Sequence, residues 1–182
     1  MKMDKVAGSG NDEFYTPVYA ILPIVKYLKE NSTIWCPFDS DESYYVKIFK
    51  KYGFDVVNTH IDDGDDFFKI DIPHCDYIIS NPPYSLKTEV IEYLFKINKP
   101  FAMLVGIVGL FESKRRFNMF NNNTFEIMYF DKRISFLESY DDIKPKLNPP
   151  FSSGYICHNV LPRQIIFEEI DKKNVHGEDI IG

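Results

Sequence analysis

Short apolar runs alternate with amphipathic stretches along most of the chain. A short, nearly continuous apolar run is typical of a buried strand, whereas apolar residues three or four positions apart mark one face of a helix. The apolar runs predict strands at residues 33–36, 55–60, 77–79, 101–105, 125–130, 154–161 and 164–168. The amphipathic stretches predict helices at residues 18–29, 42–52, 86–98 and 112–123.

Strand and helix alternate from the first strand to the fifth, which favours an α/β fold with a mostly parallel twisted sheet and helices on both faces. The last two strands, joined at Leu161-Pro162-Arg163, are expected to form a C-terminal antiparallel hairpin. No internal repeat or second domain is visible, so residues 1–182 are expected to form one domain. Residues 1–11 are expected to be a flexible arm and residues 171–182 a frayed polar tail.

The strand at residues 77–79 ends abruptly at Asn81-Pro82-Pro83-Tyr84, because prolines cannot continue a hydrogen-bonded ladder. In open α/β sheets, ligands bind at the carboxyl ends of strands, which is where these residues are expected to lie. The Asn81 carbonyl accepts hydrogen bonds, and the Pro82 carbonyl offers a second acceptor beside it. Two acceptors would hold both hydrogens of an exocyclic amine and leave its lone pair facing a methyl donor. Tyr84 would supply a face on which a flipped-out base stacks.

These residues resemble motif IV, (Asp/Asn/Ser)-Pro-Pro-(Tyr/Phe), of amino-methyltransferases that use S-adenosylmethionine. The resemblance is closest to the Dam-like adenine-N6 DNA methyltransferases of phages. It implies a Rossmann-like class I methyltransferase fold, S-adenosylmethionine as the cofactor, DNA as the partner, and a catalytic set of Asn81, Pro82, Pro83 and Tyr84. The alternative is a proline-stiffened turn that follows a strand.

Two stretches that precede the central one resemble cofactor motifs of the same family. Tyr15-Thr16-Pro17 resembles motif X, beside the methionine end of the cofactor. The alternative is a plain helix start, with Thr16 as the cap and Pro17 in the first turn. Pro37-Phe38-Asp39 resembles motif I, where Asp39 would reach the amino group of the cofactor or, alternatively, cap the next helix.

Motif I departs from the family pattern at two points. Cys36 replaces the acid before Pro37, and no glycine follows Asp39. Glycine normally lets the backbone approach a cofactor closely. The absence of glycine therefore implies either a different turn or weakened cofactor binding.

Asp66 and Phe67 resemble motif III, where the acid bonds the adenine amine of the cofactor and the aromatic ring packs on the base. The alternative is that Phe67 belongs to the core and Asp66 is solvated. A ribose-binding acid is expected at the end of the second strand, near Asp62 and Asp63, without a firm choice between the two. His60 lies there too and is assigned no role.

Basic and aromatic residues late in the chain are the expected contacts to nucleic acid. These residues are Lys114, Arg115, Arg116, Lys132, Arg133, Phe151 and Ser152. The stretch Asn148-Pro149-Pro150-Phe151 repeats the letters of the central motif, but no apolar strand precedes it. We therefore expect an extended loop there, with Phe151 and Ser152 resembling motif VIII near the target base. The alternative for the basic residues is a solvated face neutralised by nearby acids.

Composition limits these possibilities. The 182 residues are 45% hydrophobic, enough for one globular domain. The net charge of −6 argues against a protein that grips nucleic acid by bulk charge, although local basic patches remain compatible with it. The chain has no apolar run that could span a membrane and no signal-peptide pattern. Three cysteines without metal-type spacing indicate a reducing, cytoplasmic environment and no metal site.

The order of the motifs resembles the gamma class of the family, which usually carries a separate target-recognition domain. The chain shows no such domain, so a second subunit, for example in a homodimer, is one source of target contacts. Three rival functions stay open. The first is an RNA adenine-N6 methyltransferase, and the second is a protein glutamine methyltransferase, which also uses Asn-Pro-Pro-Tyr. The third is a methyltransferase-fold binding protein that has lost its activity.

Overall fold

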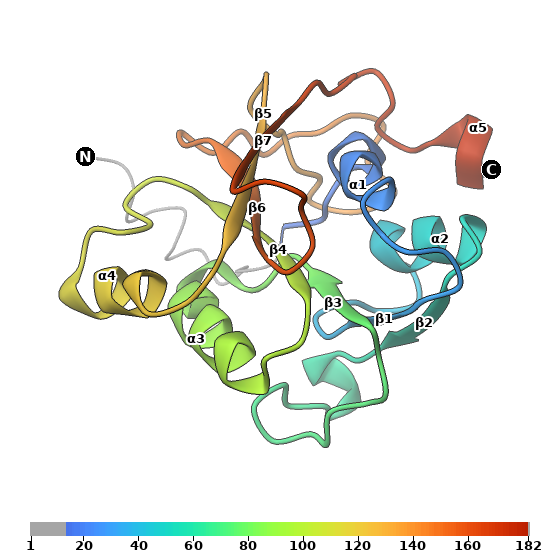
Figure 1. Ribbon diagram of the computed structural model, residues 1–182. Helices are drawn as coiled ribbons and strands as arrows, with labels where there is room; N and C mark the ends of the chain where they lie inside the picture. The colour runs from blue at the N-terminus through green and yellow to red at the C-terminus, as the bar shows by residue number, and fades with distance from the viewer. Residues whose placement is uncertain (1–13, 182) are drawn as a thin grey trace.

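The computed structural model describes residues 14–181, and it places a seven-stranded sheet between two layers of helices (Figure 1). The expected arm at residues 1–11 lies outside the described residues. The strands are β1 (Thr33–Cys36), β2 (Asp55–Asn58), β3 (Tyr77–Ser80), β4 (Phe101–Gly106), β5 (Glu126–Phe130), β6 (Ser153–His158) and β7 (Ile165–Glu168). The α-helices are α1 (Val18–Val25), α2 (Tyr44–Lys51), α3 (Lys87–Ile97), α4 (Lys114–Asn121) and α5 (Glu178–Ile181). Two short 3-10 helices, η1 (Ile61–Asp63) and η2 (Tyr84–Leu86), lie in the connections.

The strand order is β2-β1-β3-β4-β6-β5-β7, and only β6 runs against the others. The prediction of a mostly parallel α/β sheet is confirmed, and the arrangement is compatible with a Rossmann-like fold. The predicted terminal hairpin is wrong, because β6 and β7 lie on opposite sides of β5. All six positions of β6 are buried, as suits an interior strand, whereas β7 exposes Ile165 and Phe167, as suits an edge.

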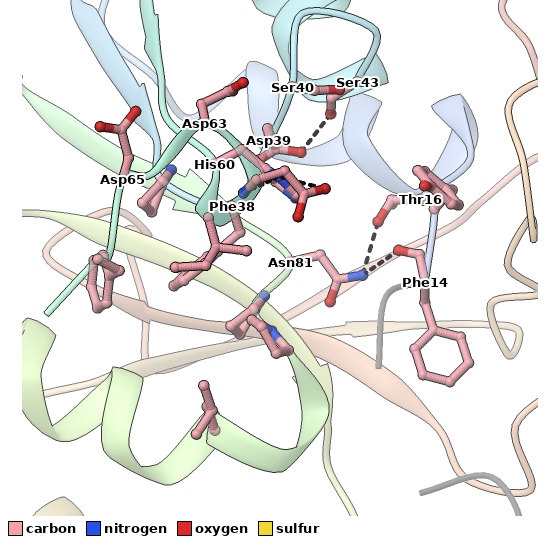
Figure 2. A pocket seen from close by; sticks show the side chains of 18 of the residues that line it. Phe14, Thr16, Phe38, Asp39, Ser40, Ser43, His60, Asp63, Asp65 and Asn81 are labelled. Atoms are coloured by element: carbon pink, nitrogen blue, oxygen red, sulfur yellow. Dashed lines mark hydrogen bonds and ion pairs between the residues drawn. The ribbon is translucent and has the colours of Figure 1, made fainter. Parts of the chain in front are cut away.

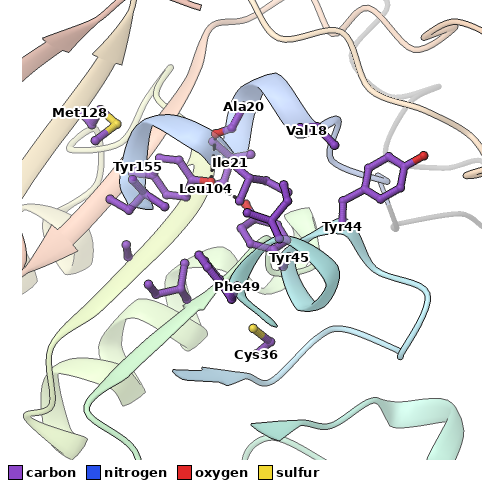
Figure 3. Close-up of a cluster of buried hydrophobic side chains, with 14 of the residues drawn as sticks. Val18, Ala20, Ile21, Cys36, Tyr44, Tyr45, Phe49, Leu104, Met128 and Tyr155 are labelled. Carbon is purple, nitrogen blue, oxygen red and sulfur yellow. Dashed lines mark hydrogen bonds between the residues drawn. The ribbon is translucent and has the colours of Figure 1, made fainter. Parts of the chain in front are cut away.

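Alternate residues of the strands build two separate cores. In β4, Ala102 and Leu104 face the layer of α1 and α2, whereas Phe101, Met103 and Val105 face the layer of α3 and α4. This alternation follows from the pleat of a strand, and burial on both faces explains the continuous apolar run. Figure 3 shows the first core, where α1 and α2 cover the sheet.

The amino end of α1 is stabilised by the C-terminal segment. The Thr16 side chain does not cap the helix, contrary to that prediction; Pro17 occupies the cap position without a side-chain bond. Instead, the N–H groups of Val18 and Tyr19 donate to the carbonyls of Val175 (2.9 Å) and Asn174 (3.0 Å). The segment expected to fray is therefore ordered against α1, because it satisfies donors that every helix start leaves open.

The three cysteines are free and buried. No helix among residues 14–181 has the length and apolar character that a membrane crossing requires.

Tyr155 tests the first core. Its hydroxyl lies 3.1 Å from the Ala20 carbonyl, to which it donates, and 2.9 Å from the Tyr45 hydroxyl (Figure 3). Tyr155→Phe should lower the free energy of unfolding by about 1–3 kcal/mol, because it removes the two hydrogen bonds that this buried hydroxyl makes, each contributing about 0.5–1.5 kcal/mol. Urea denaturation measures this loss. Tyr129→Phe is the control, since that ring stacks on Phe167 at the edge of the sheet. A loss as large in the control would contradict the assignment.

Candidate functional site

The carboxyl ends of β1, β2 and β3 meet at one edge of the sheet, because these strands are parallel neighbours. A cavity of about 560 Å³ opens there (Figure 2). Ligands of open α/β sheets bind at this edge. The cavity is lined by Phe14, Tyr15, Thr16, Pro37, Phe38, Asp39, Ser40, Ser43, His60, Ile61, Asp62, Asp63, Asp65, Asp66, Phe67, Phe68, Asn81, Pro82, Pro83, Leu86 and Tyr140.

The structure brings four separated segments of candidate residues to this one cavity. Most of the residues that the sequence predicted as cofactor-binding or catalytic line this cavity. They are Tyr15, Thr16, Pro37, Phe38, Asp39, Asp66, Phe67, Asn81, Pro82 and Pro83. Two other predicted residues, Pro17 and Tyr84, do not line it. Pro17 is buried at the start of α1.

Asn81 follows β3 directly, and its amide is held by the segment before α1. Its Nδ2 donates to the Phe14 carbonyl at 2.9 Å and to Thr16 Oγ1 at 3.2 Å (Figure 2). The Phe14 carbonyl can only accept, so the atom that faces it has to be the amide nitrogen. Asn81 Oδ1 is buried and has no hydrogen-bond partner within the described part of the chain. The side chain thus keeps one unsatisfied acceptor, in a fixed orientation, at the cavity.

Asp39 organises the turn between β1 and α2. Its carboxylate, 7% exposed, accepts hydrogen bonds from Ser43 Oγ and Ser80 Oγ, both at 2.5 Å. Ser43 is itself the cap of α2, where its Oγ accepts from the Tyr45 N–H at 3.2 Å. Asp39 therefore does not cap α2 directly; it holds the residue that does, and ties that residue to the end of β3.

This turn explains how the chain manages without glycine. Residues 37–43 adopt no positive φ angle, the conformation that would favour glycine. The Asp39 N–H donates to the Thr59 carbonyl at 3.2 Å, which joins the turn to the end of β2. The turn at residues 37–43 is therefore built without a conformation that requires glycine, and weakened cofactor binding stays an untested alternative.

The cavity is strongly acidic. Its described lining includes five aspartates, at positions 39, 62, 63, 65 and 66, and neither lysine nor arginine. Lys69 lies outside the lining and bonds Asp66 at 2.8 Å, which lowers the pKa of that carboxyl. His60 Nδ1 lies 3.5 Å from Asp62 Oδ2. This lining favours a cationic ligand or one rich in hydrogen-bond donors.

Aromatic rings form the apolar wall of the cavity. Phe67 is buried among the second core, with its ring 4.8 Å from Phe38 and 5.6 Å from Trp35. The core interpretation of Phe67 is therefore confirmed, and the ring also lines the cavity; its packing on the base of a cofactor stays a prediction. Phe68 also lines the cavity and remains 37% exposed.

Tyr84 packs away from the cavity, within a cluster of phenylalanines. Its ring centroid lies 4.6 Å from Phe14, 5.4 Å from Phe151 and 6.5 Å from Phe136. Burial raises the pKa of its hydroxyl to about 12, although Ser153 Oγ, 3.4 Å away, opposes the shift. Because β6 runs antiparallel, its start lies at the carboxyl edge of the parallel strands and brings Phe151 to Tyr84.

Some of the predicted nucleic-acid contacts already form ion pairs or hydrogen bonds within the chain. Arg115 donates to Glu89 at 3.0 Å and to Glu92 at 2.7 Å, both on α3. Lys132 lies 2.9 Å from the Asp131 carboxylate and donates to the Ile170 carbonyl. These two cations are therefore neutralised or engaged within the chain.

The remaining members of that set lie at the surface or near Tyr84. Lys114 and Arg133 are exposed, and Arg116 is half-buried. Ser152 is exposed, and its carbonyl accepts from the Ile107 N–H at 2.9 Å. The repeated Asn-Pro-Pro stretch is a loop as predicted, and Asn148 Oδ1 accepts from Ser135 Oγ at 2.6 Å.

Sequence reasoning missed several residues of the cavity wall. Phe14 and Leu86 adjoin predicted motifs and were within reach of the same reasoning, as was His60 at its strand end. No sequence motif pointed to Tyr140, because it lies in the long connection between β5 and β6. Its ring packs against the rings of Tyr15 and Tyr44 at the cavity wall. Burial, together with the Asp39 charge, raises the pKa of its hydroxyl.

Comparison of the chain with protein-family models and with curated protein sequences gives no match. Within residues 14–181, no group of three or more histidine, cysteine or acidic side chains is arranged to hold a metal ion.

Ser80→Ala tests the Asp39 turn. The substitution removes one of the two hydroxyl donors from a buried carboxylate, so unfolding should become easier by about 1.5–3 kcal/mol. Urea denaturation is measured by the fluorescence of Trp35, the single tryptophan, which is fully buried in the folded protein. The exposed Ser152→Ala is the matched control and should change stability by less than about 0.5 kcal/mol. Equal stability of the two variants would count against the bridging role.

Proposed function

We propose that the protein transfers a methyl group from S-adenosylmethionine to the N6 amine of adenine in DNA. The single observation that carries this proposal is the Asn81 carbonyl, a buried acceptor at the cavity without a hydrogen-bond partner among the described residues. An unpaired buried acceptor is unfavourable unless a ligand supplies the donor. An exocyclic amine is a donor of the required kind.

The fixed orientation of the Asn81 amide strengthens this assignment. Its nitrogen is held by Phe14 and Thr16, so the carbonyl cannot rotate away from its position without breaking two hydrogen bonds. An acceptor that is held in advance polarises a bound amine without reorganisation during the reaction, which is the usual source of catalytic rate. Pro82 lines the same cavity and is the proposed source of the second acceptor.

The charge of the cavity supports the choice of cofactor. S-adenosylmethionine carries a sulfonium and an ammonium group, and when bound it supplies the methyl group to be transferred. Five carboxyl groups without lysine or arginine among the described lining residues suit such a cation and disfavour a cofactor that carries phosphates. Asp66 and one of Asp62 and Asp63 are the proposed partners of its adenine and ribose.

In this proposal Asp39 has a structural role and does not bind the amino group of the cofactor. Both of its carboxylate oxygens accept hydrogen bonds from serines, so we assign it to the shape of the turn and to the negative potential of the cavity. The parallel half of the sheet, β2-β1-β3-β4, with helices on both faces, supports a class I methyltransferase fold.

Calorimetric titration tests the cofactor. S-adenosylmethionine should bind in the micromolar range, about −8 kcal/mol, and ATP should not bind, because its phosphates meet the acidic wall. If millimolar S-adenosylmethionine does not bind the protein, either in the absence or in the presence of DNA, the proposal is wrong.

A labelled-methyl assay tests the substrate and the role of Asn81 together. Methyl transfer to DNA should exceed transfer to RNA or to protein glutamine, and Asn81→Ala should abolish it while cofactor affinity stays nearly unchanged. Asn148→Ala is the matched control, since Asn148 precedes the same two prolines outside the cavity and should keep its activity. Loss of cofactor binding and activity together in Asn81→Ala would exclude the assigned role.

A further inference from the structure

Two cations at the starts of α3 and α4 have no acidic partner among the described residues. Lys87 is the first residue of α3, and Arg116 lies in the first turn of α4. Neither forms an ion pair with any residue in the described part of the chain. Arg116 Nε is moreover buried without a hydrogen-bond partner among the described residues.

The packing of α4 on α3 brings these two cations together. Arg115 binds Glu89 and Glu92, which fixes the first turn of α4 alongside the first turns of α3. Arg116 follows Arg115 in the first turn of α4, and Lys87 lies in the first turn of α3, so both belong to the junction that Arg115 holds. Burial, and secondarily the Arg116 charge, lower the pKa of Lys87. Like charges in partial burial at one junction are unfavourable unless an anion accompanies them.

Lys87 adjoins the aromatic cluster that contacts the proposed site. Lys87 Nζ donates to the Gly106 carbonyl at 3.3 Å, at the end of β4. Gly106 lies against Phe151 and Tyr84, because a Cβ at Gly106 would be 2.8 Å from the Phe151 ring and 3.5 Å from the Tyr84 ring. Tyr84 in turn contacts Phe14, whose carbonyl holds Asn81.

The surface around Arg116 also carries an exposed ring. Phe117, the next residue on α4, is 59% exposed. Nucleic acids bind to surfaces that combine cations for phosphates with exposed aromatic rings for bases. Glu112 is the acid of the segment that leads into α4, and it is exposed beside Gly109.

We propose that Lys87 and Arg116 bind one backbone phosphate of a polynucleotide, next to the nucleotide whose base enters the site. This inference rests on the proposed function, because the phosphate belongs to the strand that carries the target adenine. It adds Lys87 to the nucleic-acid contacts and removes Arg115, whose guanidinium is occupied by two carboxylates.

Fluorescence anisotropy with short labelled polynucleotides tests the pair. Duplex DNA, single-stranded DNA and RNA are titrated separately at rising sodium chloride concentrations, which identifies the source of the phosphate. Lys87→Met and Arg116→Met remove the charges and keep the aliphatic stems. Each should weaken binding uniformly across sequences, and the double variant should lower the salt slope by about 0.9 on duplex DNA or about 0.7 on a single strand.

Charge-preserving and matched variants complete the experiment. Lys87→Arg and Arg116→Lys should retain the wild-type slope, and Lys51→Met, at the exposed end of α2, should leave it unchanged. A slope that stays the same in the folded double variant, or falls equally in Lys51→Met, would overturn the inference, as would a wild-type protein that binds no polynucleotide. Calorimetry with S-adenosylmethionine on the same variants separates the two proposals, because Lys87 and Arg116 do not line the cavity.

Discussion

The buried Asp39 carboxylate is the interaction on which the candidate site depends. It accepts one hydroxyl from the start of α2 and one from the end of β3, so a single side chain links the turn after β1 to the residue before Asn81. A buried carboxylate is tolerated only when its oxygens are satisfied. The requirement fixes both serines in place, and through Ser80 it fixes the point at which Asn81 leaves the sheet.

Most elements of the fold were predictable because their signals are local. The apolar runs at Thr33–Cys36 and Phe101–Gly106 predict buried strands from their composition alone. The place of β7 was not predictable, because strands adjacent in sequence usually pair with each other, whereas β7 pairs in parallel with β5 and does not contact β6 in the sheet. The sequence of β7 carried no clue to this edge position, because its exposed residues, Ile165 and Phe167, are as apolar as the buried Ile166 between them.

In the candidate site too, the residues were predictable from local sequence, whereas their contacts were not. The resemblance of short motifs selected Thr16, Asp39 and Asn81, and the structure places all three at one cavity. Their actual hydrogen bonds could not be inferred, because partners such as Ser80 and Phe14 are set by three-dimensional packing. Tyr84 illustrates the opposite case, where a motif residue packs among phenylalanines from distant parts of the chain.

The docking of the C-terminal segment on α1 has a consequence for the order of assembly. The first helix of the described chain obtains its amino-terminal hydrogen-bond acceptors, Asn174 and Val175, from the other end. Such long-range closure comes late in folding, because its loop entropy has to be offset by contacts already formed. Thr16, which holds the Asn81 amide, is separated from that helix only by Pro17. During synthesis, the sheet edge would therefore exist before the Asn81 amide is oriented, and the site would mature only after residues 174 and 175 have been added.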